Sequence, residues 1–266
     1  MKKYSFIGAG NMAYAIIGGM GDSADITVYD KLTSQYGKFN GKVKIADSVP
    51  AAVKTADYIV LAVKPQNFKE VLAEIKDSGV CLDGKVFISI AAGVKTSSVC
   101  NKLGKRVPVI RTMPNTPLLI GKGVTALSRN EEVSDEAFDE ITKMFSRLGK
   151  TLILPEDKMN AIICATSSAP AYIYHLIDCM IQEAKGQGLD GEDMLSAICE
   201  TVKGSADMIM QSDKTPKELV RMVTSPNGTT ERAMRVFYDA ELETTVGKAM
   251  RACTERAEQL SDELDN

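Results

Sequence analysis

The sequence contains few of the residues that form metal, disulfide and nucleic-acid sites. It has a single histidine, and its six cysteines are scattered without a CxxC pair. This pattern favours small buried cysteines in a reducing compartment over a disulfide framework or a zinc site. The net charge is −3 and no run of lysine or arginine occurs, so no basic face is available for nucleic acid. We therefore expect no metal, and a small metabolite as the partner.

Long apolar runs are also absent. The first apolar run, which begins at Tyr4, is too short for a signal peptide or a membrane span, so we expect no membrane partner and a cytoplasmic location. The 266 residues, of which 44% are apolar, suffice for one large α/β domain or two smaller ones.

The most informative stretch opens the chain. A short β-forming run ends at Ile7 and passes through GAGNMA, residues 8–13, into an apolar-periodic segment, which indicates a strand, a tight turn and a helix. Gly8 permits a sharp turn, Gly10 lets the backbone approach a pyrophosphate, and the small Ala13 lets helix and strand pack closely. The stretch predicts a dinucleotide cradle; the alternative is an ordinary strand-to-helix turn.

A second predicted strand, residues 25–30, ends in Asp30 about twenty residues past the glycine turn. An aspartate there can bind the adenosine ribose 2′-hydroxyl and repel a 2′-phosphate, which favours NAD. Lys31 and Lys38 could attract a phosphate instead, so NADPH and NADH both stay candidates. The alternative is that Asp30 only caps the strand in a solvated loop.

Two continuous apolar runs, residues 57–63 and 86–90, predict strands covered on both faces of a parallel sheet. Ligands of such sheets lie beyond the carboxyl ends of the strands. The first run stops at Lys64-Pro65, which therefore falls at the cofactor's edge, unless Lys64 is only a surface lysine. The second ends in small residues at 91–93, which leave room for a nicotinamide ring or form only a tight turn.

The remaining pattern divides the chain near Pro155. Before it, Ser48 and Ser134 are predicted N-caps of helices over 48–54 and 134–148. After it only helical periods occur, which predicts a doubly wound, mostly parallel α/β domain over 1–154 and an all-α domain over 155–266. Further strands are predicted at 42–45, 105–111, 123–127 and 151–154, and helices at 158–185, 191–210, 216–224, 230–237 and 241–263.

The helix predicted over 158–185 is apolar on several faces. A small helical domain cannot bury such a helix alone, so a partner subunit should cover part of it, which predicts an obligate dimer. The lone His175 lies on this helix, and we interpret it as a core or interface histidine rather than a catalytic one.

A polar stretch, VTSPNGTTE at residues 223–231, stands out in the apolar second half. Pro226 fixes φ, Asn227-Gly228 makes a turn, and Thr229 or Thr230 can cap the helix that follows. Hydroxyls and backbone N–H groups at a helix N-terminus suit a carboxylate, with Ser225, Gly228 and Thr229 as donors. The alternative is a loop whose hydroxyls bond only to its own backbone.

Six motifs spread over the chain form one set. They are FIGAGNMA at 6–13, LAVKPQ at 61–66, ISIAAGV at 88–94, R-x-MPNTP at 111–117, Pro-Ala-Tyr at 170–172 and VTSPNGTT at 223–230. The chain thereby resembles, almost end to end, the pyrroline-5-carboxylate reductases, which reduce Δ1-pyrroline-5-carboxylate to L-proline with NADPH or NADH in proline biosynthesis. The resemblance implies a Rossmann domain followed by a helical substrate-binding and dimerisation domain, with dimers that often assemble into rings.

The resemblance also assigns roles to positions. It implies that Ser225, Gly228, Thr229 and Thr230 hold the substrate carboxylate and ring nitrogen, and that this loop can reach the cofactor across a dimer. The residues implied to line the cofactor, with Asp30 from the strand pattern, are Gly8, Gly10, Asn11, Met12, Ala62, Val63, Lys64, Pro65, Ala91 and Ala92.

The chain departs from the family pattern at three places. The usual Ser-Gly-Ser-Gly-Pro is here TSSAP at 166–170, the usual Gly-Gly of the substrate loop is Asn227-Gly228, and an asparagine that contacts the adenosine ribose is replaced by Val49. The third change puts one cofactor hydrogen bond in doubt. None of them removes the chemistry.

A protonated imine is already an electrophile, so its reduction needs positioning more than an acid or a base. Thr230 is the candidate catalytic residue, either orienting the ring nitrogen or relaying a proton. One alternative is a β-hydroxyacid dehydrogenase, but that chemistry needs a lysine that residues 159–180 lack. The other is a non-catalytic NAD(P)-binding regulator, which would not need the hydroxyls of residues 225–230.

Overall fold

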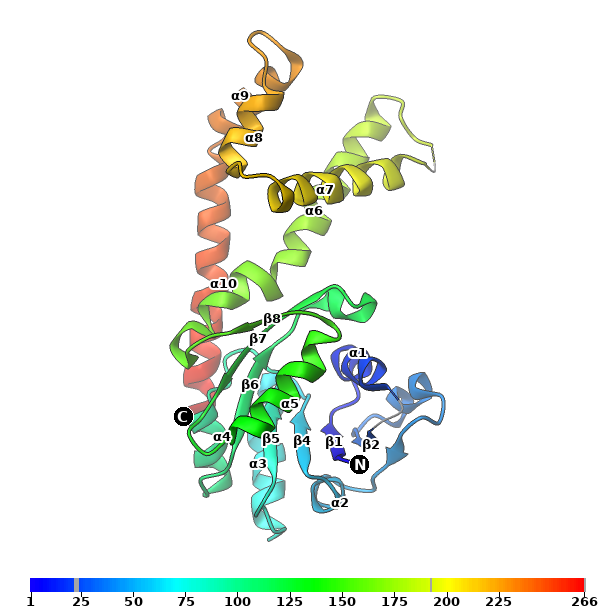
Figure 1. The fold of residues 1–266 in the computed structure, drawn as a ribbon, viewed down its shortest axis with the longest axis vertical. Coiled ribbons are helices and arrows are strands. Elements are labelled where there is room, and N and C mark those ends of the chain that lie inside the picture. The colour runs from blue at the N-terminus through cyan, green and yellow to red at the C-terminus, as the bar shows by residue number, and fades with distance from the viewer. Residues whose placement is uncertain (22–23, 192, 266) are drawn as a thin grey trace. The chain divides into compact units, whose positions relative to one another are not determined.

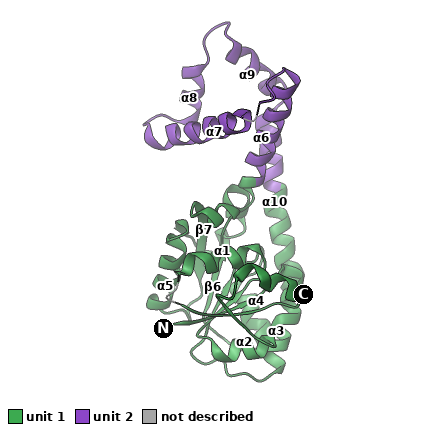
Figure 2. Ribbon diagram, turned by 90° about the vertical axis from the view of Figure 1, so that its right-hand side faces the viewer, with its two compact units in different colours: residues 1–170, 252–266 green, residues 171–251 purple. Residues whose placement is uncertain are grey.

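The computed structural model of the chain describes residues 1–21, 24–191 and 193–265. By its internal contacts the chain divides into two compact units (Figure 2). Residues 1–170 and 252–266 form unit 1, and residues 171–251 form unit 2. The predicted boundary after residue 154 follows the end of the last strand. The contact boundary lies later because Met159 and Ile163 pack with Ala257 of the last helix in a small core beside the sheet.

The centre of unit 1 is an eight-stranded sheet with the order β3-β2-β1-β4-β5-β6-β7-β8. Neighbouring strands are parallel except for the antiparallel pair β6 and β7. The predicted doubly wound, mostly parallel sheet is therefore confirmed (Figure 1). The strands are β1 Lys3–Ile7, β2 Asp25–Tyr29, β3 Lys44–Ile45, β4 Tyr58–Leu61, β5 Val86–Ser89, β6 Val109–Met113, β7 Gly123–Arg129 and β8 Gly149–Ile153.

The helices of unit 1 cover both faces of this sheet, and a hydrophobic core fills each side. One core joins the sheet to α1 and α5, and the other joins it to α2, α3, α4 and the end of α10. Short helical turns at Thr33–Phe39, Pro65–Asn67, Thr116–Ile120, Glu156–Lys158 and Ile163–Ser167 connect the elements. The helices are α1 Asn11–Met20, α2 Val49–Thr55, α3 Phe68–Asp77, α4 Thr96–Leu103, α5 Asp135–Ser146 and the C-terminal α10 Leu242–Asp265.

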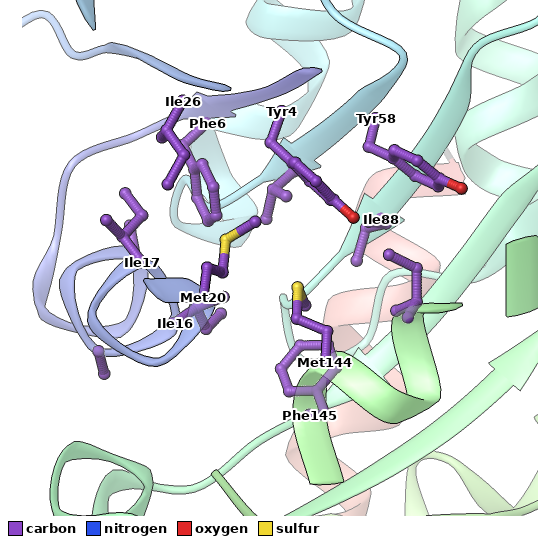
Figure 3. Close-up of a cluster of buried hydrophobic side chains, with 14 of the residues drawn as sticks. Tyr4, Phe6, Ile16, Ile17, Met20, Ile26, Tyr58, Ile88, Met144 and Phe145 are labelled. Atoms are coloured by element: carbon purple, nitrogen blue, oxygen red, sulfur yellow. The ribbon is translucent and has the colours of Figure 1, made fainter. Parts of the chain in front are cut away.

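Alternation along the strands explains their continuous apolar runs. Phe6 and Val60 belong to the core beside α1, whereas their neighbours Ile7 and Ile59 belong to the core beside α3. Figure 3 shows part of the first core, where Phe6 lies beside Ile17 and Met20 of α1. Since successive side chains of a strand point to opposite faces, a strand covered on both sides needs no polar positions.

Both predicted N-caps are confirmed. The side chain of Ser48 accepts a hydrogen bond from the Ala51 N–H, and that of Ser134 accepts one from the Ala137 N–H. The strand predicted over 105–111 is displaced: β6 starts at Val109 and runs through Met113, because Thr112 and Met113 pair with β7 instead of opening the proline turn.

Unit 2 consists of helices and the first half of α10. Among its described residues, Ile198 alone is buried, so a single copy of this unit has almost no core of its own. The predicted helical periods are all present, although the segment predicted from 158 to 185 is broken before Pro170. The helices are α6 Ala169–Gly186, α7 Asp193–Gln211, α8 Pro216–Val223 and α9 Thr229–Asp239.

The first long helix, which we expect a partner subunit to cover in part, is largely exposed in the single chain. In α6, Tyr174 is 58% exposed, Leu176 48% and Met180 40%. His175 is exposed too, with its Nε2 atom 3.9 Å from the Cys179 sulfur. Large apolar side chains exposed along one helix are typical of a surface that another chain covers.

The cysteines are unpaired, as expected, but none is buried. Cys81, Cys179 and Cys199 are exposed, and the other three are half-buried. Within the described residues, no group of His, Cys, Asp or Glu side chains is placed to hold a metal ion. No helix in that same part of the chain is long and apolar enough to cross a membrane.

Candidate functional site

The glycine turn between β1 and α1 is shaped by contact with the end of β4. Gly8 has a φ of +106°, and a Cβ atom there would lie 2.5 Å from the carbonyl oxygen of Ala62, so no other residue fits. A Cβ atom on Gly10 would instead point into open space. Contacts within the protein therefore do not require glycine at position 10. A ligand that approaches the backbone closely would require it, because a side chain there would be in the way.

Gly10 is also the N-cap of α1 and, because glycine has no side chain, it supplies no side-chain acceptor for the first N–H groups of the helix. Those N–H groups and the helix dipole favour an anion at this end. The turn therefore fits the pyrophosphate of a dinucleotide, as the sequence predicts.

Asp30, directly after β2, is tied to the glycine turn. Its Oδ2 atom accepts a hydrogen bond from the Ala9 N–H at 2.7 Å, and its Oδ1 atom accepts one from the Leu32 N–H at 2.8 Å. The Tyr36 hydroxyl donates to the Asp30 carbonyl at 2.7 Å. Each carboxylate oxygen has a second lone pair that a ribose hydroxyl can use. Asp30 thus ties the end of β2 to the glycine turn, a structural role that the sequence did not predict, and its carboxylate can still bind the ribose hydroxyl.

The two lysines that could attract a phosphate are both engaged. Lys31 forms an ion pair with Glu70, with 2.5 Å between Nζ and Oε1, and the hydrogen bond raises the pKa of Lys31. Lys38 donates to Gln35 at 2.7 Å. Each ammonium group thus already has one partner in the single chain.

A cavity of about 590 Å³ lies at the carboxyl ends of β1, β2 and β4. It also contains residues that the motif did not predict, among them Tyr29, Leu32 and Asn67, and Val49 stands where the family asparagine is expected. Of the predicted cofactor residues, Met12, Pro65, Ala91 and Ala92 do not line it. Those that line it are Gly8, Gly10, Asn11, Asp30, Ala62, Val63 and Lys64.

The turn after β5 lies beside this edge, because Ser89 pairs with Leu61 in the neighbouring strand. Ala91 is buried and Ala92 is half-buried. Gly93 has a φ of +77°, and a Cβ atom there would lie 2.7 Å from the carbonyl oxygen of Ala257 in α10. The glycine is therefore required by the close approach of α10, a reason that the sequence did not reveal.

The polar loop of unit 2 is a tight turn before α9. Gly228 donates its N–H to the Ser225 carbonyl at 3.0 Å, and Asn227 has a φ of +59°. Gly228, rather than a threonine, is the N-cap, so the expectation that Thr229 or Thr230 caps α9 is wrong. The turn closes before Thr229, which makes both threonines part of the first helical turn.

The hydroxyls of this stretch differ in their partners. The Thr224 hydroxyl donates to the Val220 carbonyl at 2.7 Å, so the alternative of local backbone bonding holds for this residue. Within residues 1–21, 24–191 and 193–265, the hydroxyls of Ser225, Thr229 and Thr230 make no hydrogen bond, so that alternative does not hold for these three. The Glu231 carboxylate accepts from the Asn227 N–H at 2.6 Å. One carboxylate is thus already bound at this end of α9, in keeping with its preference for anions.

Two family models match separate parts of the chain. The model described as pyrroline-5-carboxylate reductase dimerisation matches residues 156–260. The model described as NADP oxidoreductase coenzyme F420-dependent matches residues 3–93.

Curated proteins and solved structures match along the whole length. The pyrroline-5-carboxylate reductases of Pseudomonas aeruginosa and Escherichia coli are 35% and 33% identical to this chain, and each match covers 98% of both chains. A crystal structure of Plasmodium falciparum pyrroline carboxylate reductase with NADP bound has a TM-score of 0.90 at 26% identity and 98% coverage of both chains. A pyrroline-5-carboxylate reductase structure from Coxiella burnetii has a TM-score of 0.81 at 32% identity, covering 97% of this chain and 98% of that one. The chain therefore belongs to the pyrroline-5-carboxylate reductase family.

Proposed function

We infer that this protein is a pyrroline-5-carboxylate reductase, which reduces the C=N bond of 1-pyrroline-5-carboxylate to give L-proline with NADPH or NADH. The observation that carries this inference is the match to curated reductases over 98% of both chains, together with a glycine turn that fits a dinucleotide. The dehydrogenase and regulator alternatives have no comparable support.

We propose that the cavity at the glycine turn holds the dinucleotide. The first turn of α1 binds the pyrophosphate, Asp30 the adenosine ribose, and Ala62 to Pro65 the edge of the cofactor. The turn at Ala91 and Ala92, outside the cavity lining, borders the nicotinamide ring. A bound reduced nicotinamide supplies the hydride that the reaction consumes.

We propose that the loop before α9 holds the imine. Ser225, Gly228 and Thr229 bind its carboxylate through hydroxyl and N–H donors, and the α9 dipole adds about 0.3–1 kcal/mol. Thr230, which is half-buried, directs its hydroxyl to the ring nitrogen and fixes which face of the ring is presented. Because the protonated imine is already electrophilic, these residues need only hold it and exclude water.

The protein forms a homo-oligomer through its helical half. The match to a dimerisation model over residues 156–260 and the exposed apolar side chains of α6 agree on this. We propose that the basic unit is a dimer, that dimers assemble into a larger ring, and that the substrate loop of one subunit serves the cofactor of another.

We further propose that residues 1–154 are the cofactor-binding domain and residues 155–266 the substrate-binding and dimerisation domain. The start of the dimerisation match at residue 156 supports this division. A cytoplasmic location is also proposed, and the unpaired cysteines support a reducing compartment.

A steady-state assay tests the proposed function. Purified protein is mixed with pyrroline-5-carboxylate and either NADPH or NADH, and cofactor oxidation is followed by absorbance. We expect oxidation that depends on both the imine and the protein, with L-proline as the product. Cofactor binding without any imine-dependent oxidation would favour the regulator alternative.

A further inference from the structure

A buried arginine lies in the middle of β6, opposite Ser89, the last residue of β5. The side chain of Arg111, in β6, is 1% exposed, and burial lowers its pKa. Its nearest acid is Glu156, with 3.8 Å between Nη1 and Oε1, and its Nε atom has no hydrogen-bond partner among the described residues. A buried guanidinium with incomplete pairing contributes little to stability, so its position here calls for another explanation.

One arm of hydrogen bonds leads from this arginine to the turn after β5. Arg111 Nη2 donates to Asn160 Oδ1 at 2.5 Å, and Asn160 Nδ2 donates to Ser261 Oγ at 3.2 Å. Ser261 Oγ in turn donates to the carbonyl oxygen of Gly93 at 2.5 Å. The Ser261 hydroxyl also lies 3.2 Å from the Ala257 carbonyl oxygen of its own helix, and the contact with Gly93 is the shorter of the two. With the proton on that shorter contact, the donors run from the cation toward the Gly93 carbonyl, and each bond polarises the next.

A second arm leads to the start of α4. The Glu156 carboxylate, which faces Arg111, accepts hydrogen bonds from the N–H and the hydroxyl of Thr96 at 2.6 and 2.7 Å. Thr96 is the first residue of α4, whose N–H has no partner inside the helix. The segment from Gly93 to Thr96 is thus held at both ends by groups that meet at Arg111.

We propose that Arg111, Asn160 and Ser261 are positioning residues that fix the Gly93 carbonyl, and with it the turn 91–93, in the conformation that receives the nicotinamide ring. This proposal rests on the proposed function, which places that turn beside the ring. Three segments far apart in sequence, β6, the connection after β8 and α10, are joined in one chain of hydrogen bonds that ends at the Gly93 carbonyl.

Ser261→Ala is the most specific probe, because it removes one hydroxyl and leaves the arginine in place. Ser98→Ala is the matched control. Ser98 is equally buried and its hydroxyl also bonds to α10, at Asp265, without touching Gly93. Any general loosening of α10 affects both variants, whereas only the first releases the turn.

The readout compares a reduced cofactor with its fragment that lacks nicotinamide. We would measure the dissociation constants of NADH and ADP-ribose, and of NADPH and 2′-phospho-ADP-ribose, each in a separate titration without the imine. Ser261→Ala should weaken binding of the whole cofactor about three- to tenfold, corresponding to one hydrogen bond, and change fragment binding less than about twofold. It should also lower kcat more than it raises the KM for the imine. Ser98→Ala should leave two quantities at the wild-type value: the affinity for the whole cofactor relative to that for the fragment, and kcat relative to the KM for the imine.

Equal effects of Ser261→Ala on cofactor and fragment, or no effect on either, would overturn the proposal. Arg111→Lys keeps the charge but cannot reproduce the planar guanidinium fork. It should also weaken binding of the whole cofactor more than binding of the fragment, by no more than Ser261→Ala does. Because the titration needs no imine, a wild type that binds cofactor but does not reduce pyrroline-5-carboxylate would refute the proposed reaction alone.

Discussion

The carboxylate of Asp30 accepts a hydrogen bond from the backbone N–H of Ala9 at 2.7 Å, which joins the end of β2 to the glycine turn. A negative charge therefore stands at a fixed place in the cavity that we assign to the cofactor, and the neighbouring Lys31 is already paired with Glu70. A ribose 2′-hydroxyl can donate to this carboxylate, whereas a 2′-phosphate would meet repulsion.

This arrangement predicts a preference for NADH. We expect kcat/KM for NADH to exceed that for NADPH by roughly tenfold or more. Asp30→Asn keeps an acceptor for a backbone N–H but removes the charge, and should reduce the preference mainly by improving NADPH. Asp30→Ser should act in the same direction. An unchanged ratio of kcat/KM in both variants would exclude Asp30 as the discriminating group.

Thr230→Ala should lower turnover by about 10- to 10³-fold, because one oriented hydrogen bond to the imine nitrogen is lost. Cofactor affinity and the thermal midpoint should stay near wild type. Thr201→Ala is the control, since this exposed threonine of α7 bonds only to the Ala197 carbonyl of its own helix. Wild-type turnover in the Thr230 variant would remove this residue from the mechanism.

Leu176→Asp should dissociate the oligomer. Leu176 is 48% exposed in the single chain, where aspartate would be tolerated, but a partner that covers it would have to bury a charge. Ile45→Asp is the matched control, because Ile45 is 46% exposed and lies on the edge strand β3. Sedimentation velocity should show a smaller species for the first variant only. Identical sedimentation of both variants would place the interface elsewhere.

Alkaline pH should destabilise the protein through two stacked tyrosines. Tyr4 and Tyr58, seen side by side in Figure 3, have ring centroids 4.9 Å apart, and each hydroxyl donates to Glu140 at 2.8 Å. Burial, followed by the hydrogen bond to this carboxylate, raises the pKa of both hydroxyls. Unfolded tyrosines lose their protons near pH 10, so above that pH the folded state binds more protons and the free energy of unfolding falls.

Tyr58→Phe tests this linkage. The variant should be less stable than wild type at pH 8, but its free energy of unfolding should decline less steeply above pH 10, since one linked proton is gone. Tyr14→Phe, at a 42% exposed ring of α1, should keep the wild-type slope. Urea unfolding at a series of pH values provides the measurement, and equal slopes in all three proteins would contradict the linkage.

Ser134→Ala should lower the free energy of unfolding by about 0.5–2 kcal/mol, because its hydroxyl accepts the otherwise free Ala137 N–H at the start of α5. Ser146→Ala, at the other end of the same helix, removes only an exposed hydrogen bond to the Lys143 carbonyl. That control should change stability by less than about 0.5 kcal/mol. Chemical denaturation at one fixed protein concentration separates the two.

The fold could be predicted largely because its signals are local. The serine caps, the apolar strand runs and the glycine turn each reflect a few neighbouring residues, and each lies where the sequence indicates. The start of β6 was missed because it depends on pairing with β7, a non-local interaction. The exposure of α6 in the single chain, by contrast, agrees with the subunit contact that its apolar faces predict.

The site was only partly predictable for the same reason. The residues of one motif, such as Gly8 and Gly10, could be assigned from known dinucleotide sites. The bond between Asp30 and Ala9, the pairing of Lys31 with Glu70, and the requirement for glycine at position 93 arise from contacts between distant segments. No local sequence pattern indicates such contacts. The burial of the Arg111 side chain also arises from contacts between distant segments.

The central claim is that this protein reduces the C=N bond of pyrroline-5-carboxylate by hydride transfer. Its most direct test is incubation of the imine with cofactor deuterated in turn on each face of the nicotinamide C4, followed by mass spectrometry of the proline. We expect proline that carries one deuterium on C5 with one of the two labelled cofactors, and unlabelled proline with the other. Absence of proline, or proline without deuterium in both reactions, would contradict it.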